Sequence, residues 1–316
     1  MKRIIITILL AVSLDIAMAQ SRMLPLNDMV ASTSALSSGG SRYAADEALV
    51  YTLPSAAFEK DGSFCADYSV AIIPSDEYTQ TLHTLTAAWH KGRHAVLMGG
   101  RYWLMGKQDI FVDENMKETS KPHLMIRSYA FDAGYAFALS GSFHTYATVG
   151  YVSEKALATV CAVRGTIGAD YTYKGKLLGL EAKYLAGVSV ANLGCYSCGD
   201  DSGSLSPRIG AGGNVGLVTG HGQNISANVD VGMYLASGNV KSETELAAGI
   251  GYTFLYNYTL RVGTHIGDND NALTAGAAVR IGRVTVNGGV KIAAASDACN
   301  VYMLSLIHIS EPTRRR

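Results

Sequence analysis

The 316-residue sequence lacks a net charge, because 26 Lys and Arg residues balance 26 Asp and Glu residues. A chain with no basic excess gives no reason to expect a nucleic-acid partner. Charged residues are scarce, at 16% of the chain, and there are only 6 prolines. Low charge together with 34 glycines and 18 tyrosines is typical of outer-membrane strands, in which tyrosines form girdles at the membrane interfaces.

Beyond its N-terminus the sequence also lacks an apolar run long enough for a membrane helix. Residues 1–19 are predicted to be a cleaved secretory signal peptide. Lys2 and Arg3 precede the apolar stretch 4–14, and small residues at 17–19 form a cleavage site. An uncleaved amphipathic start is the alternative. An exported chain without a spanning helix can cross a membrane only as a closed barrel.

Cysteine is scarce as well, with 5 residues in the whole chain. Cys195 and Cys198 form a CxxC motif in a predicted outer loop, where we expect a disulfide; free thiols and a metal or redox site are the alternatives. A structural zinc site normally needs four ligands, and a thioredoxin-like motif needs a strand-to-helix turn. The histidines show no catalytic spacing either. The sequence therefore predicts no metal, no cofactor and no enzymatic activity.

What the sequence does contain is regular alternation between apolar and polar or small residues. In 223–235, for example, Ile225, Val229 and Val231 alternate with Asn228 and other polar or small residues. Successive side chains of a strand point to opposite faces, so each such segment has one apolar side. The segments are about ten residues or longer, as a tilted strand crossing a bilayer requires. A soluble β-sandwich of two open sheets is the alternative.

These patterns predict an all-β fold, a transmembrane antiparallel up-and-down β-barrel of about 14 strands with the last one truncated. Short and long connections alternate along the chain, as in barrels with short periplasmic turns and longer outer loops. The predicted strands lie near 63–73, 78–90, 93–105, 123–138, 141–151, 157–173, 176–191, 207–219, 222–235, 242–256, 257–267, 271–282, 283–293 and from 300 onward.

Two segments flank the predicted barrel. Residues 304–316, LSLIHISEPTRRR, look like translated sequencing-adaptor DNA of the transposase type, and a natural basic tail is the alternative. Residues 20–62 lack alternation and are predicted to pack inside the barrel as a plug, with a periplasmic leader as the alternative. The predicted organisation is a signal peptide (1–19), a plug or leader (20–62), a barrel (63–303) and a non-native tail (304–316).

Charged side chains within the strands are assigned to the lumen, since a charge facing lipid costs roughly 2–4 kcal/mol at mid-membrane. In 123–138, Tyr129 and Phe131 form part of a lipid-facing stripe while Asp132 points inward. We interpret the inward charges as a solvated or mutually paired interior; a dedicated ligand site is the alternative. The predicted lumen-facing polar residues are Asp132, Arg164, Asp170, Glu181, Lys183, Asp230, Arg261 and Arg280.

Short motifs recur in order along nearly the whole mature chain. They are 39–48 (GGSRYAADEA), 51–58 (YTLPSAAF), 168–171 (GADY), 190–194 (VANLG), 207–210 (PRIG), 248–252 (AGIGY) and 260–263 (LRVG). This ordered set resembles the PorV/PorQ branch of FadL-like barrels. The chain departs from that pattern at Gly251, where Glu is usual, at Thr264, where Tyr is usual, and at 53–55, which lacks the usual Asn.

The resemblance implies a fourteen-stranded outer-membrane barrel with an N-terminal plug in a Gram-negative bacterium. PorV-like members serve type IX secretion and bind exported cargo through its C-terminal signal domain. FadL-like relatives instead transport hydrophobic compounds. The polar inward faces favour the secretion role. The expected partners are then the outer-membrane lipid around the barrel, exported cargo proteins and components of the secretion system. The alternative is a transporter of hydrophobic small molecules, which a continuous apolar tunnel would favour, and a purely structural barrel is a third reading.

Overall fold

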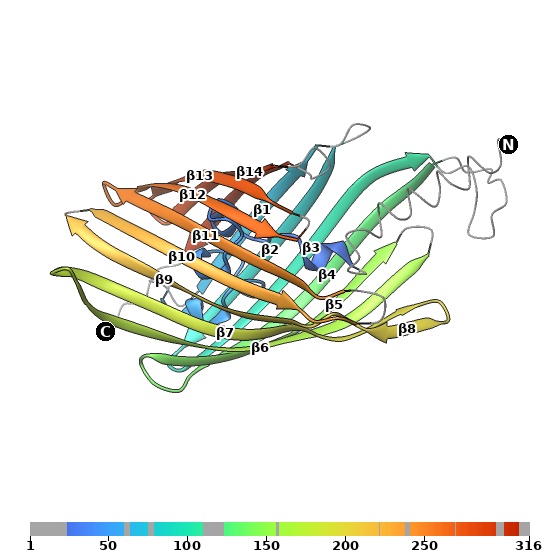
Figure 1. The fold of residues 1–316 in the computed structure, drawn as a ribbon, viewed down its shortest axis with the longest axis horizontal. Coiled ribbons are helices and arrows are strands. Elements are labelled where there is room, and N and C mark those ends of the chain that lie inside the picture. The colour runs from blue at the N-terminus through green and yellow to red at the C-terminus, as the bar shows by residue number, and fades with distance from the viewer. Residues whose placement is uncertain are drawn as a thin grey trace.

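The strands of the chain close into one antiparallel barrel, seen from the side in Figure 1. The computed structural model describes residues 24–59, 64–74, 79–109, 123–155, 158–220, 222–237, 241–268, 270–294 and 300–309. Within those ranges no helix is long and apolar enough to cross a membrane.

The described residues form fifteen strands, of which fourteen make the barrel. They are β1 (Phe64–Ile73), β2 (Gln80–Lys91), β3 (His94–Asp109), β4 (His123–Ala138), β5 (Phe143–Lys155), β6 (Thr159–Leu177), β7 (Leu180–Cys198), β8 (Asp201–Ser204), β9 (Arg208–Gly220), β10 (Gln223–Tyr234), β11 (Glu243–Phe254), β12 (Tyr258–Gly267), β13 (Ala272–Ile281), β14 (Val284–Ala293) and β15 (Val301–Ile309).

Each barrel strand pairs antiparallel with its neighbours, and β1 closes the ring by pairing with β15. The short strand β8 lies outside the ring and pairs only with the end of β7. A ring of this kind has no open sheet edge, and closure is what removes unpaired backbone groups from lipid. The prediction of an antiparallel barrel of about fourteen strands is confirmed, and the β-sandwich alternative is wrong.

Two connections differ from their predicted positions. A tight turn was expected at 174–176, but β6 and β7 pair beyond it, as far as Leu177 with Leu180. The turn lies at Leu178 and Gly179, whose φ angles of 53° and 82° are those of a hairpin turn that follows the strand twist. The expected loop 192–207 is largely the β7–β8 hairpin, because its residues continue the extended pairing.

Side-chain exposure follows the predicted faces. On β4, Phe131 is 62% exposed and Tyr135 is 46% exposed, whereas Ser128 and Ala130 are fully buried. Apolar residues on the outside of a barrel are what a lipid environment requires. Strand alternation therefore makes the outer surface apolar, and the inward faces contact the N-terminal segment.

The N-terminal segment 24–59 forms a plug of short helices within the barrel (Figure 1). Its helices are η1 (Pro25–Asn27), α2 (Thr33–Leu36), η2 (Arg42–Ala44) and η3 (Pro54–Glu59). Helix α2 contacts β13, β14 and β15, η2 contacts β9 and β10, and η3 contacts β2 to β5. All four residues of α2 are buried. The plug thus touches most of the ring, which places its polar side chains against the lumen wall.

The last strand includes residues assigned to the predicted adaptor tail. Leu304 pairs with Val70 of β1 and with Gly288 of β14. Its neighbours fit the strand because Leu304 and Leu306 are exposed while Ser305 is buried, so the alternation continues across the junction. The structure thus completes the strand that was expected to be truncated, whereas the non-native origin of 304–316 stays a prediction.

Candidate functional site: the cavity between plug and barrel wall

The plug backbone lies directly on glycines of the barrel wall. A Cβ atom added at Gly276 would lie 2.5 Å from the Ser37 Cβ, and one at Gly263 would lie 2.5 Å from the Ser38 carbonyl carbon. Gly39 itself has a φ of +78°, a left-handed conformation that side chains disfavour. Glycine on both surfaces therefore allows the plug to approach β12 and β13 at backbone distance.

Three of the predicted lumen residues form ion pairs with the plug, one of them Asp230 with Arg42. The Arg261 Nη2 lies 3.4 Å from the Asp46 Oδ2, and the Lys183 Nζ pairs with Glu59 near the end of the plug. The expected pairing of inward charges is therefore partly a pairing between wall and plug. Strand alternation predicts the inward direction of these residues but not their partners, which belong to a segment more than a hundred residues away.

Glu47 is a buried carboxylate at the centre of the plug, and it is only 1% exposed. Its Oε1 accepts a hydrogen bond from the Ser34 backbone N–H at 2.7 Å. Its Oε2 accepts from the Asn287 side-chain amide at 3.0 Å and from the Ser305 hydroxyl. Burial, and next the charge of Asp46, raise the pKa of Glu47 to about 7. The Glu47 side chain thus links the plug to β14 and β15 by hydrogen bonds.

A group of four charged side chains lies on one wall of the lumen. Asp230 accepts hydrogen bonds from the Arg42 Nε at 3.3 Å and from the Arg208 Nη2 at 3.0 Å. Arg208 also pairs through its Nε with Glu245. Arg42 comes from the plug and the other three from β9, β10 and β11. Buried ion pairs are tolerated only when such partners are supplied, and here the plug supplies one of them.

Across the lumen, Tyr51 of the plug lies beside two arginines of the wall. The guanidinium carbons of Arg101 and Arg164 are 5.4 Å and 5.9 Å from the centre of the Tyr51 ring. Arg164 pairs with Asp132 at 3.0 Å, joining two predicted lumen residues. Arg101 donates to the backbone carbonyls of Leu26 and Met29. Burial, and next the charge of Asp132, raise the pKa of Tyr51, so its hydroxyl stays protonated.

The remaining predicted lumen residues lie away from these groups. Asp170 pairs with the His144 Nδ1 at 2.9 Å, and both are buried. Glu181 is exposed, and Arg280 lines a separate recess near Arg261. The predicted lumen residues therefore do not form one cluster. Of that set, only Asp132, Arg164 and Asp230 line the cavity between plug and wall.

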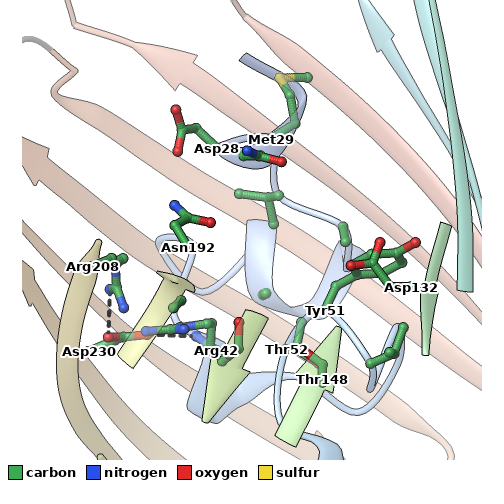
Figure 2. A pocket seen from close by; sticks show the side chains of 18 of the residues that line it. Asp28, Met29, Arg42, Tyr51, Thr52, Asp132, Thr148, Asn192, Arg208 and Asp230 are labelled. Atoms are coloured by element: carbon green, nitrogen blue, oxygen red, sulfur yellow. Dashed lines mark hydrogen bonds and ion pairs between the residues drawn. The ribbon is translucent and has the colours of Figure 1, made fainter. Parts of the chain in front are cut away.

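Between the plug and the wall is a cavity of about 160 Å³. Figure 2 shows Arg42 and Arg208 both reaching Asp230, with Tyr51 and Asp132 on the other side of the view. The plug adds apolar lining from Met29, Val30, Val50 and Pro54. The cavity therefore has an apolar surface from the plug and a charged surface from plug and wall together.

Sequence reasoning missed several residues of this cavity. Arg101 lies on β3, and Arg208 is the first residue of β9, within the 207–210 motif. Strand alternation places both side chains on the inward face, so this local pattern could have identified them. Arg42 and Tyr51 lie in the plug, where no periodic pattern indicates a direction. The packing of the plug sets the positions of Arg42 and Tyr51, and no local sequence pattern predicts them.

The predicted disulfide between Cys195 and Cys198 is not formed in this structure, where both thiols are free. Both residues lie in β7 rather than in a loop. Residues three apart in an extended strand point to opposite faces and are too far apart for a disulfide, which needs Cα atoms within about 7 Å. The pairing of Cys195 with Ser204 and of Cys198 with Asp201 holds them in that extended conformation.

The fold is similar to those of several transporters and channels. The toluene transporter TbuX of Ralstonia pickettii has 11% identity and a TM-score of 0.52, over 87% of this chain and 96% of that chain. The toluene transporter TodX of P. putida has 11% identity and a TM-score of 0.55, over 89% and 98%. The monoaromatic hydrocarbon channel CymD has 9% identity and a TM-score of 0.57, over 89% and 98%.

No protein-family model matches the chain, and neither does any curated protein sequence. At identities near one in ten the structural likeness shows the fold alone. The shared fold is the closed antiparallel barrel. The resemblance to the PorV/PorQ branch of FadL-like barrels stays a prediction.

Proposed function

We propose that this protein is an outer-membrane transporter of small hydrophobic or amphipathic compounds. The observation that carries the proposal is a cavity between plug and wall inside a barrel whose fold matches toluene transporters over almost their full length. Ligand sites are concave, with mostly apolar lining and a few placed polar groups. This reverses the order expected from the sequence, in which the secretion role came first.

In this proposal the plug controls passage, since it occupies the lumen and provides the apolar lining of the cavity. A compound can pass only when the plug shifts, and a shift must break the ion pairs of Asp46 with Arg261 and of Arg42 with Asp230. Each is a contact between plug and wall. Asp46 is partly exposed, and Asp230 keeps its contact with Arg208 when Arg42 leaves, so neither carboxylate is left buried without a partner when the plug shifts.

The first experiment measures uptake of labelled toluene by cells that express the protein and lack other transporters of this type. A second chain carries Asp46→Cys and Arg261→Cys, with the native cysteines replaced by serine, so that a bismaleimide can join plug to wall. We expect uptake by the parent chain, and loss of uptake when the crosslinker is added to the double variant. Equal uptake by expressing and non-expressing cells would contradict the proposal.

An accessory role in type IX secretion is the second candidate, and one observation favours it. The cavity is small and carries four arginines, so it is not the continuous apolar tunnel that a transporter was expected to have. A barrel that works through its rim needs no passage. Crosslinking in native membranes followed by mass spectrometry tests this candidate, because recovery of exported proteins that share a C-terminal domain would support it.

A further inference from the structure

Two short turns of the barrel carry large apolar side chains that are exposed. Leu178 in the β6–β7 turn is 91% exposed, and Leu255 and Tyr256 in the β11–β12 turn are 66% and 69% exposed. All three residues have left-handed φ angles, of 53°, 52° and 63°. Both turns lie at the same end of the barrel (Figure 1), where the connections are short, and we expect this end to face the periplasm.

Leucine is a costly residue for such turns in water. Left-handed positions of hairpin turns favour Gly, Asn and Asp, because a Cβ atom crowds the backbone there. Three other turns at the same end follow that rule, with Gly92, Gly222 and Gly282 at φ angles of 60°, 74° and 62°. Exposing Leu178 and Leu255 to water is unfavourable as well. Their positions at the turns therefore indicate an apolar environment around them.

The β6–β7 hairpin carries its leucines beyond the wall of the barrel. In the described part of the chain, β5 pairs with β6 only as far as Tyr171, and β9 pairs with β7 only as far as Glu181. The hairpin strands continue to pair with each other up to Leu177 and Leu180. The leucines at the tip therefore contact the surroundings of the barrel rather than a neighbouring strand.

The same end of the barrel is basic. Among its described strands and turns, six exposed side chains are cationic, namely Lys91, Arg93, Lys174, Lys176, Arg280 and Arg283. Glu181 is the one exposed carboxylate of those strands and turns, and the exposed Glu59 of the plug pairs with Lys183. At the other end the described exposed charges of the strands and turns balance, with Arg127, Lys155, Lys241, Asp200, Asp201 and Asp268.

We propose that the short-turn end of the barrel binds anionic phospholipids of the surrounding leaflet. Leu178 and Leu255 contact the acyl boundary, and the lysines and arginines contact the phosphates. Apolar side chains flanked by basic ones are the combination that holds a protein surface to anionic lipid. A soluble anion would leave the leucines in water, and a neutral lipid would leave the basic charge without a complement. The proposal does not depend on which compound passes through the lumen.

The test uses native mass spectrometry of the full chain purified in detergent. Phosphatidylglycerol, which is anionic, competes with phosphatidylethanolamine, which is zwitterionic and carries the same acyl chains. We expect phosphatidylglycerol to be retained in preference by about fivefold or more. A triple variant with Arg93→Gln, Lys174→Gln and Lys176→Gln should lose most of that preference. Displacement of the lipid by an excess of glycerol phosphate would reveal a site for the phosphate alone and would overturn the proposal.

The matched control removes three cations from the balanced end, by Arg127→Gln, Lys155→Gln and Lys241→Gln. It should keep the preference of the parent chain. Equal preference in the parent chain and in both triple variants would overturn the proposal, and so would equal losses in the two variants.

The leucines are tested by a double variant with Leu178→Asn and Leu255→Asn. Because asparagine suits left-handed positions, this variant should melt no earlier than the parent chain in detergent alone, yet retain less phosphatidylglycerol. Undiminished retention would contradict the role of the leucines. A photoreactive benzophenone side chain placed at position 178 in living cells should form adducts with phospholipid, and adducts with a protein in place of phospholipid would overturn the proposal.

Discussion

At the scale of single residues, the plug is held by groups whose burial makes them sensitive to small changes. Glu47 is fully enclosed and hydrogen-bonded to both plug and wall. Gly263 and Gly276 leave room only for hydrogen where the plug backbone passes. These contacts are local, but each one decides whether a segment of about thirty-six residues stays seated.

The first prediction concerns the pH dependence of that seating. The pKa of Glu47 is raised from 4.5 to about 7 in the folded protein, first by burial. A raised carboxylate pKa means that the folded state binds the proton more tightly, so its stabilising contribution is complete below about pH 4.5 and is lost as pH rises through 7. The full change is on the order of 3 kcal/mol. The protection factors of residues 33–52, which are hydrogen-exchange rates corrected for the intrinsic rate of an unstructured chain at the same pH, should therefore be larger at pH 5 than at pH 8.

Glu47→Gln is the matched variant for this prediction, because an amide keeps the shape and cannot ionise. It should make the protection factors of the plug amides nearly independent of pH between 5 and 8. A pH dependence that is as steep in the variant as in the parent chain would assign the effect to other groups.

The second prediction concerns close approach of backbone to backbone. Gly263→Ala places a methyl group 2.5 Å from the Ser38 carbonyl carbon, so the plug must move. Overpacking of this kind typically costs about 1–3 kcal/mol. Limited proteolysis should cut the plug of this variant faster than that of the parent chain. Gly288→Ala is the control, since a Cβ there has no neighbour within 4 Å, and identical cleavage rates in the two variants would contradict the argument.

At the scale of elements, closure of the ring depends on β15. This strand pairs with β1 over eight residue pairs and with β14 over another eight. Without it both neighbours would expose a row of unpaired backbone groups, which lipid does not satisfy. Closure of the barrel therefore depends on the length of its final strand.

The third prediction follows from that dependence. Ending the chain after Met303 leaves only three residues of β15, so we expect the barrel to fail to close and to lose its resistance to unfolding in detergent at room temperature. Ending it after Ile309 keeps the whole strand and should leave the barrel intact. Gel mobility of unheated and heated samples separates the two states, and an intact barrel in the shorter chain would show that β1 and β14 close the ring without β15.

At the scale of the whole molecule, the barrel separates an apolar exterior from a polar, plugged interior. Residues such as Val149 and Ile250, which are 57% and 56% exposed, face outward across the belt of strands, while the arginines and carboxylates face the plug. This division explains how a membrane protein can contain so many ion pairs, because they lie in the lumen, away from lipid.

The fourth prediction tests that division directly. Val149→Arg places a charge on the lipid side and should cost about 2–4 kcal/mol if it lies near the bilayer midplane. Ser202→Arg in β8 lies outside the ring and should change stability little. Denaturant titration of the barrel folded in lipid vesicles measures both. Equal stability of the two variants would mean that the surface around Val149 does not contact lipid.

The barrel could be predicted from the amino-acid sequence, because strand alternation is a local pattern with a period of two. This pattern located the bounds of the fourteen strands to within four residues, except for the end of β7, which runs seven residues past 191, and it assigned Asp132, Arg164 and Asp230 to the lumen. The contacts of these three side chains could not be predicted, because they depend on how the plug packs in the lumen. The plug has no periodic pattern, so the positions of Arg42, Glu47 and Tyr51 depend on packing between distant segments. The disulfide between Cys195 and Cys198 was wrongly predicted for the same reason. Pairing with β8 keeps the two residues extended and apart, and no local sequence pattern predicts that pairing.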